Sequence, residues 1–93
     1  MIIEKTKVFN EWFLNLKDRV LMIAIVKRLE KIENHDHFGD YKVIDGEICE
    51  LRIHFGAGYR VYFAQKNSKI ILLLCAGDKS TQQKDIKKAR ELI

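Results

Sequence analysis

Proline is absent from this sequence of 93 residues, and no repeat, low-complexity tract or linker is visible. A chain of this length has room for one hydrophobic core, so we expect a single domain over residues 1–93. The longest apolar run, residues 70–76, is too short to cross a bilayer. The first residues carry Glu4 and Lys5 where a signal peptide would have its apolar core. These absences predict a cytoplasmic protein that does not enter the membrane.

Cysteine is scarce, and its two occurrences are isolated from each other. Cys49 and Cys75 each lie in an apolar-rich segment without a second cysteine nearby. In the cytosol such residues are expected to be reduced thiols that pack as small hydrophobic side chains. A disulfide stays open, but no feature of the sequence favours it. Cys75 lies in the most apolar stretch, where a reactive thiolate is disfavoured.

Acidic residues become scarce in the second half of the chain. Residues 1–49 contain eight Lys/Arg and nine Asp/Glu, whereas residues 50–93 contain nine Lys/Arg and four Asp/Glu. The formal net charge of +4 therefore originates entirely in the second half. A basic excess confined to one part of a chain is typical of proteins that bind a polyanion, most often nucleic acid. A basic surface that serves only solubility is the alternative.

The spacing of apolar residues predicts two helices near the start of the chain. After a short strand over residues 1–5, apolar residues recur at helical spacing over residues 8–16 and again over residues 21–32. Thr6 and Asp18 precede these two segments and are suitable N-caps. We expect the two helices to form a hairpin, with the charged residues of the second helix on its outer face, including Lys27 and Arg28.

From residue 41 onward the apolar pattern changes from the helical period to a period of two. Four strands are predicted, over residues 41–44, 50–55, 59–64 and 69–76. The last strand is almost continuously apolar, as expected of a strand covered on both faces. Residues 81–93 then predict a basic helix. The fold class is α+β: an N-terminal strand and a helical hairpin packed on an antiparallel β-meander, with a C-terminal helix. The sequence does not determine which strand the first one joins.

Alternation along the second and third strands of the meander places polar side chains together on one face of the sheet. Arg52 and His54 share one side of their strand, and a tight hairpin brings Arg60 and Tyr62 beside them. Lys79, just past the last strand, can reach the same surface. These cations, with an imidazole and a phenol, can bind a phosphodiester and supply proton transfer and charge stabilisation. A solvated sheet face with unrelated polar residues fits the alternation equally well.

Neither a metal ion nor an organic cofactor is expected. His35 and His37 lie close together on a loop, but no further ligands follow at the spacing of a metal site. The glycine-containing segment over residues 56–58 precedes a strand rather than a helix, so it offers a phosphate no helix N-terminus. A hairpin turn explains that segment fully.

Two segments carry a resemblance to a known protein family. ELRIHFGAGYRVYF over residues 50–63 and LLLCAGDKSTQ over residues 72–82 resemble the phage-derived addiction-module killer proteins of the RelE/ParE toxin superfamily, often labelled HigB-like. The resemblance extends over essentially the whole chain, and it implies the same fold. It also implies a toxin of a type II toxin–antitoxin system that is neutralised by a helix-turn-helix antitoxin. Many relatives act on the ribosome, where they cleave the translated mRNA.

The resemblance further implies roles for individual residues. Arg60 matches the arginine of the family's GYR hairpin segment and would hold the scissile phosphate. Lys79 takes the place of a basic residue after the last strand and would stabilise the transition state. Arg52 lies close to the position of cations in relatives and is expected to bind RNA together with Arg60 and Lys79. Lys84, in the basic C-terminal helix, is a further candidate for RNA binding.

The residues that would transfer protons are not implied by the resemblance. His54 and Tyr62 are candidates because of their place on the sheet face. RelE has two lysines on the strand that here carries His54, and it has a tyrosine in a terminal helix, whereas residues 81–93 contain none. The ParE branch inhibits DNA gyrase by binding, without a catalytic centre. Three hypotheses follow: a metal-independent mRNA endoribonuclease that inhibits translation, a gyrase inhibitor, or an RNA-binding protein of the toxin fold without catalytic activity.

Overall fold

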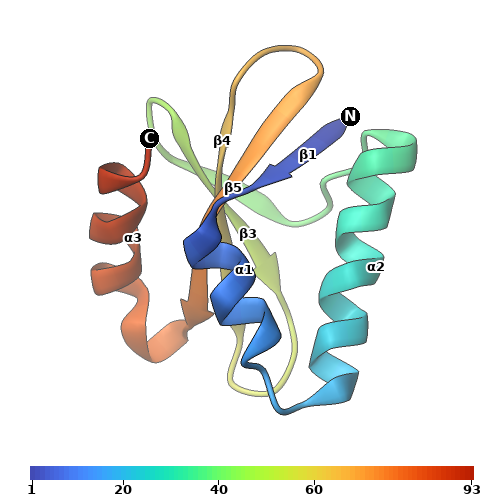
Figure 1. The fold of residues 1–93 in the computed structure, drawn as a ribbon, viewed down its shortest axis with the longest axis vertical. Helices are drawn as coiled ribbons and strands as arrows, with labels where there is room; N and C mark the ends of the chain where they lie inside the picture. The colour runs from blue at the N-terminus through green and yellow to red at the C-terminus, as the bar shows by residue number, and fades with distance from the viewer.

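A five-stranded sheet forms the centre of the fold in the computed structural model, which describes residues 1–93 (Figure 1). The strands are β1 (Ile2–Lys5), β2 (Tyr41–Asp45), β3 (Ile48–Ile53), β4 (Tyr59–Gln65) and β5 (Ile70–Asp78). They lie in the order β1-β5-β4-β3-β2. Strands β2 to β5 form the antiparallel meander, and β1 pairs in parallel with β5, so that Ile2 lies opposite Ile70. The predicted α+β class is confirmed, and the first strand lies at the sheet edge beside β5.

Three helices surround this sheet. They are α1 (Lys7–Leu14), α2 (Arg19–His35) and α3 (Gln82–Glu91), the last preceded by the 3-10 turn η1 (Lys79–Thr81). Both predicted caps are confirmed: Thr6 Oγ1 accepts a hydrogen bond from the amide of Phe9, and Asp18 accepts from the amides of the first turn of α2. Helix α2 ends where Asp36 adopts the left-handed conformation, with φ of 53°. The helix therefore extends slightly further than the apolar spacing predicted.

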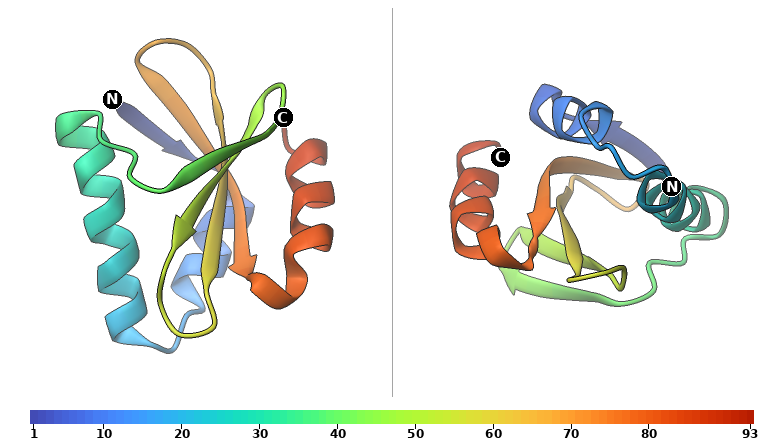
Figure 2. Two further views of the ribbon diagram at one scale, coloured as in Figure 1. Left: turned by 180° about the vertical axis from the view of Figure 1, so that it is seen from behind. Right: turned by 90° about the horizontal axis from the view of Figure 1, so that it is seen from below.

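The core consists of two layers, one on each face of the sheet (Figure 2). Helices α1 and α2 cover one face, where their buried apolar residues, including Phe9 and Ile25, pack against Leu51, Val61 and Leu73. Helix α3 covers part of the other face. Because β5 lies between the two layers, most of it is buried on both sides, as its apolar sequence predicted. Burial of this apolar surface is the main favourable term in folding.

The two cysteines are free thiols on different strands. Cys75 lies beneath α3, where its Sγ donates a hydrogen bond to the carbonyl oxygen of Asp85 at 3.3 Å. Burial, followed by the negative charge of Asp85, raises the pKa of Cys75 to about 12. No helix of the structure combines the length and the apolar character that a membrane span requires.

Helix α3 covers much of the sheet face that alternation predicted to be polar and exposed. Ile86 and Ala89 of α3 pack on this face with Tyr62, which is fully buried. The expectation that Tyr62 lies on an exposed surface is therefore wrong, although it does share a strand and a side with Arg60. The face is open near the β3–β4 hairpin loop, residues 54–58, which is at the bottom of Figure 1.

Candidate functional site

A hollow of about 440 Å³ lies where the β3–β4 hairpin meets the start of η1. It is lined by Arg52, Ile53, His54, Gly56, Ala57, Gly58, Tyr59, Arg60 and Lys79. The amide of Lys79 donates a hydrogen bond to the carbonyl oxygen of Gly58 at 3.1 Å, which joins η1 to the hairpin. Gly58 has φ of 96°, a conformation that L-residues rarely adopt, so the turn depends on glycine there. Segments far apart in sequence thus form one site.

Two arginines of the hollow lie directly opposite each other, with a buried carboxylate between them. Arg52 on β3 pairs with Arg60 on β4, and Glu50, on the same side of β3, is 0% exposed. Arg52 Nε donates a hydrogen bond to Glu50 Oε1 at 3.1 Å, and Arg60 Nε lies 3.4 Å from Glu50 Oε2. Gln82 of α3 donates to Oε2 at 2.9 Å. The carboxylate offsets the repulsion between the opposed cations, while its own burial requires these partners.

His54 lies one residue past β3 and forms a close pair with an aspartate. Its Nε2 is 2.6 Å from Oδ2 of Asp40, and 77% of its side chain is exposed. The hydrogen bond with His54, together with the positive charge of Arg52, holds the pKa of Asp40 below its usual range. Because an ionised carboxylate only accepts hydrogen bonds, Nε2 of His54 carries the proton. In the neutral imidazole, Nδ1 is then left as an acceptor.

Arg28 of α2 holds the segment that carries Asp40. Its guanidinium donates to the carbonyl oxygens of Phe38 at 2.8 Å and Asp40 at 3.1 Å, and it also donates to the carbonyl of Arg52. Gly39 adopts φ of 69°, and a Cβ there would lie only 3.1 Å from this guanidinium. Burial lowers the pKa of Arg28 from its usual value. The expectation that Arg28 lies on the outer face of the helix is wrong, because it points toward the sheet.

The structure brings four of the six predicted site residues together. Those that line the hollow are Arg52, His54, Arg60 and Lys79. Arg60 is the least accessible of the three cations that line the hollow. Its side chain is 16% exposed, that of Arg52 is 35% exposed, and Lys79 is an exposed residue. Three positive charges and one imidazole thus converge on a space that can hold a phosphate group.

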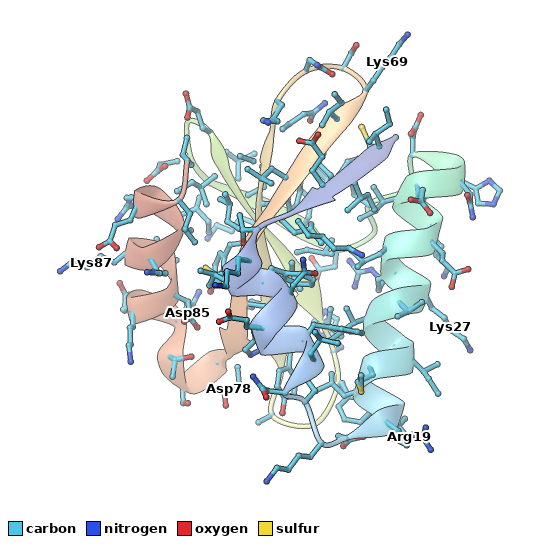
Figure 3. All side chains as sticks on the ribbon, viewed as in Figure 1. Arg19, Lys27, Lys69, Asp78, Asp85 and Lys87 are labelled. Atoms are coloured by element: carbon cyan, nitrogen blue, oxygen red, sulfur yellow. The ribbon has the colours of Figure 1, made fainter.

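Two predicted residues lie outside the hollow. Burial, followed by the charges of Glu50 and Asp85, raises the pKa of Tyr62 far above its usual value, and its hydroxyl has no hydrogen-bond partner. This position prevents contact between Tyr62 and a ligand in the hollow. Lys84 lies on α3 in an exposed charged group that includes Lys87, which points away from the sheet in Figure 3. Lys84 can contribute charge near the site but does not line it.

Three contributors to the site were missed from the sequence. Glu50 is two residues before Arg52, so both lie on the same side of β3. The burial of Glu50, however, depends on the position of α3. Asp40 precedes β2 directly and comes near His54 only through the folded arrangement of the loop. Arg28 lies at helical spacing from the buried Leu21, Ile25 and Ile32, so the spacing does signal the inner face of α2, whereas its charge had suggested the outer face.

The basic excess of the second half of the chain is divided among several places. Arg52, Arg60 and Lys79 surround the hollow, and a second group lies on α3. Lys69, in contrast, lies at the β4–β5 turn, at the end of the sheet opposite Asp78 (Figure 3). Charge complementarity to a polyanion is therefore concentrated near one end of the sheet, and Lys69 is too distant to take part.

Comparison with known proteins gives two matches. The family model described as "Phage derived protein Gp49-like (DUF891)" matches residues 11–93. A protein of Haemophilus influenzae, itself described as uncharacterized, is 43% identical over 90 residues, a match that covers 97% of this chain and 90% of that protein. The family match contains every residue of the hollow, together with Arg28, Asp40 and Glu50.

Proposed function

The chain belongs to the family of phage-derived Gp49-like proteins, a family of the toxin–antitoxin type, and from this premise we propose that it is the toxin of such a pair. We further propose that it is an endoribonuclease that cleaves translated mRNA on the ribosome, in the cytoplasm. The observation that carries this proposal is the hollow, in which Arg52, Arg60 and Lys79 surround a histidine paired with Asp40. Anion binding and proton transfer are thereby combined in one place.

The proposed reaction is an attack of a ribose 2′-oxygen on the adjacent phosphorus. Nδ1 of neutral His54 accepts the 2′-hydroxyl proton, and the carboxylate of Asp40 stabilises the imidazolium that results. The O2′–P bond forms and the P–O5′ bond breaks, so the products are a 2′,3′-cyclic phosphate and a 5′-hydroxyl. Water protonates the departing oxygen because the site is open to solvent. Arg60, Arg52 and Lys79 stabilise the additional negative charge on the phosphorane.

A gyrase inhibitor of the ParE type is the rival proposal. It would use the basic surface for binding, but it has no use for an imidazole held by a carboxylate. The pair of His54 and Asp40 therefore favours the nuclease over both the gyrase inhibitor and an RNA-binding protein without catalysis. The partner we propose for neutralisation is a helix-turn-helix antitoxin.

A reconstituted cleavage reaction tests the nuclease directly. Purified protein is added to ribosomes that carry a defined mRNA, and the ends of the fragments are identified by their chemistry. We expect cuts in ribosome-bound mRNA that leave 2′,3′-cyclic phosphate and 5′-hydroxyl ends, without added metal. Ends with a 5′-phosphate, or no cuts while DNA gyrase is inhibited in a parallel assay, would contradict the proposal.

A further inference from the structure

Glu50 is the only charged residue among the buried residues of this protein. Burial of a carboxylate costs several kcal/mol unless good partners compensate it. Here the partners come from three elements: Arg52 on β3, Arg60 on β4 and Gln82 on α3. The fold alone does not require a carboxylate at this position. An apolar side chain would fill the same space without the free-energy cost of burying a charge.

The contacts of Glu50 leave the outer ends of both guanidinium groups available. In each arginine it is Nε, the nitrogen nearest the main chain, that approaches the carboxylate. The terminal nitrogens are the ones that bind a phosphate in bidentate geometry. Nη1 of Arg52 lies 3.9 Å from Asp40 Oδ1, which is an ion-pair distance but not a hydrogen bond. The carboxylate thus holds Arg52 by a hydrogen bond from Nε and Arg60 by an ion pair at Nε, which has no hydrogen-bond partner.

We infer that Glu50 is a positioning residue, which holds the terminal nitrogens of Arg52 and Arg60 toward the hollow and makes their orientation depend, through Gln82, on the docking of α3. The inference deepens the proposed function and rests on it, because it assigns the two arginines to an RNA phosphate. Glu50 itself does not touch the RNA, since it is fully buried.

Two effects of Glu50 on anion binding have opposite signs, so they can be separated. Through its charge alone, a carboxylate beneath the site repels a phosphate, and its removal would tighten binding. Through positioning, its removal frees two long side chains that must then be ordered on binding, and affinity falls. The direction of the change therefore shows which effect is larger.

The experiment compares Glu50→Gln with Glu47→Gln in binding to a fluorescent 2′-O-methyl oligouridine, which cannot be cleaved. Glu47 is exposed in the β2–β3 turn, so both variants remove one negative charge but only one of them alters the site. Fluorescence anisotropy measures the affinity. We expect Glu50→Gln to weaken binding about fivefold or more, corresponding to roughly 1 kcal/mol, and Glu47→Gln to leave it unchanged or slightly tighter. Unchanged or tighter binding by Glu50→Gln would overturn the inference.

A spectroscopic measurement does not depend on RNA at all. The Nε–Hε resonance of Arg52 in a ¹⁵N NMR spectrum reports its hydrogen bond to Glu50. We expect this resonance to move in Glu50→Gln and to stay in Glu47→Gln. If Glu50→Gln fails to fold, Gln82→Ala keeps the carboxylate and loosens it from α3, so a smaller shift with about twofold weaker binding is expected. A folded Gln82→Ala protein with an unchanged resonance and affinity would then overturn the inference.

Failure of the inference differs from failure of the proposed function. If the wild-type protein does not bind the oligonucleotide, or if Arg60→Ala binds it equally well, RNA binding in the hollow is wrong, and the inference falls with it whatever the resonance of Arg52 shows. If binding depends on Arg60 and is not weakened by Glu50→Gln, only the positioning role is wrong.

Discussion

At the residue scale, the three cations of the hollow differ in how firmly they are held. Arg52 and Arg60 form ion pairs with the buried Glu50, whereas Lys79 of the 3-10 turn is exposed to water. A side chain that is fixed before the ligand arrives loses less conformational freedom on binding. We therefore assign the phosphate contact to the two arginines and the more adaptable contact to Lys79.

Substitution of Arg60 tests this assignment. We expect Arg60→Ala to lower the rate of mRNA cleavage by roughly 10²–10³-fold, as removal of one group that stabilises a developing oxyanion does in other enzymes. The matched control is Lys69→Ala, which removes the same charge at the far end of the sheet and should retain full activity. The rate is measured with ribosome-bound mRNA. Equal losses in the two variants would mean that net charge, rather than the hollow, determines activity.

The lowered pKa of Asp40 predicts a dependence of stability on pH. Because this pKa lies below its usual value in the folded protein, the ionised carboxylate stabilises the fold above the ordinary pKa of about 3.9. That stabilisation is lost as the pH falls through the lowered folded-state value. We expect the free energy of unfolding to fall more steeply below about pH 4 in the wild-type protein than in Asp40→Asn. Urea unfolding followed by the fluorescence of Trp12, the single tryptophan, measures it.

The matched control for this prediction is Glu47→Gln, which removes an exposed carboxylate at the opposite end of β3 from His54. It should keep the acid dependence of the wild-type protein. The same steepness in all three proteins would show that the contact between Asp40 and His54 does not contribute to stability.

At the element scale, local signals were sufficient for most strands and helices but not for their packing. Thr6 and Asp18 cap helices as predicted, because a cap depends on neighbouring residues only. The place of α3 depends on a few apolar contacts, mainly through Ile86 and Ala89, in an otherwise charged helix. Its docking buries Tyr62 and Glu50, and no pattern within their own strands contains that information. The cations of the hollow could be predicted from the sequence, but the carboxylates that contact them, Glu50 and Asp40, could not.

Helix α2 contributes to the site through Arg28. The free energy of unfolding of an Arg28 variant tests this contribution. We expect Arg28→Met to lower the free energy of unfolding by about 2 kcal/mol, because three main-chain carbonyls lose a charged donor while the apolar stem is kept. Lys27→Met is the control, since Lys27 points away from the sheet (Figure 3). Urea unfolding gives both values. A change below about 0.5 kcal/mol in Arg28→Met would show that these hydrogen bonds do not hold the loop.

At the scale of the whole molecule, the residues that form the core and the residues that line the hollow lie in different parts of the fold. The two core layers lie along the sheet, while the hollow lies at one end, where a hairpin, a 3-10 turn and a loop meet. Functional residues on such segments, held by a rigid scaffold, are a common arrangement in proteins. The toxin that we propose would meet its target at this end of the molecule, where the three cations lie.

Induced expression without an antitoxin, followed by mapping of the 5′ ends of total mRNA, tests the central claim most directly. We expect rapid growth arrest and new 5′ ends that are confined to translated regions, and neither effect with Arg60→Ala at equal protein levels. Growth arrest with intact mRNA, or cuts equally frequent in untranslated RNA, would contradict a ribosome-dependent nuclease and remove the catalytic roles assigned to His54, Arg60 and Lys79.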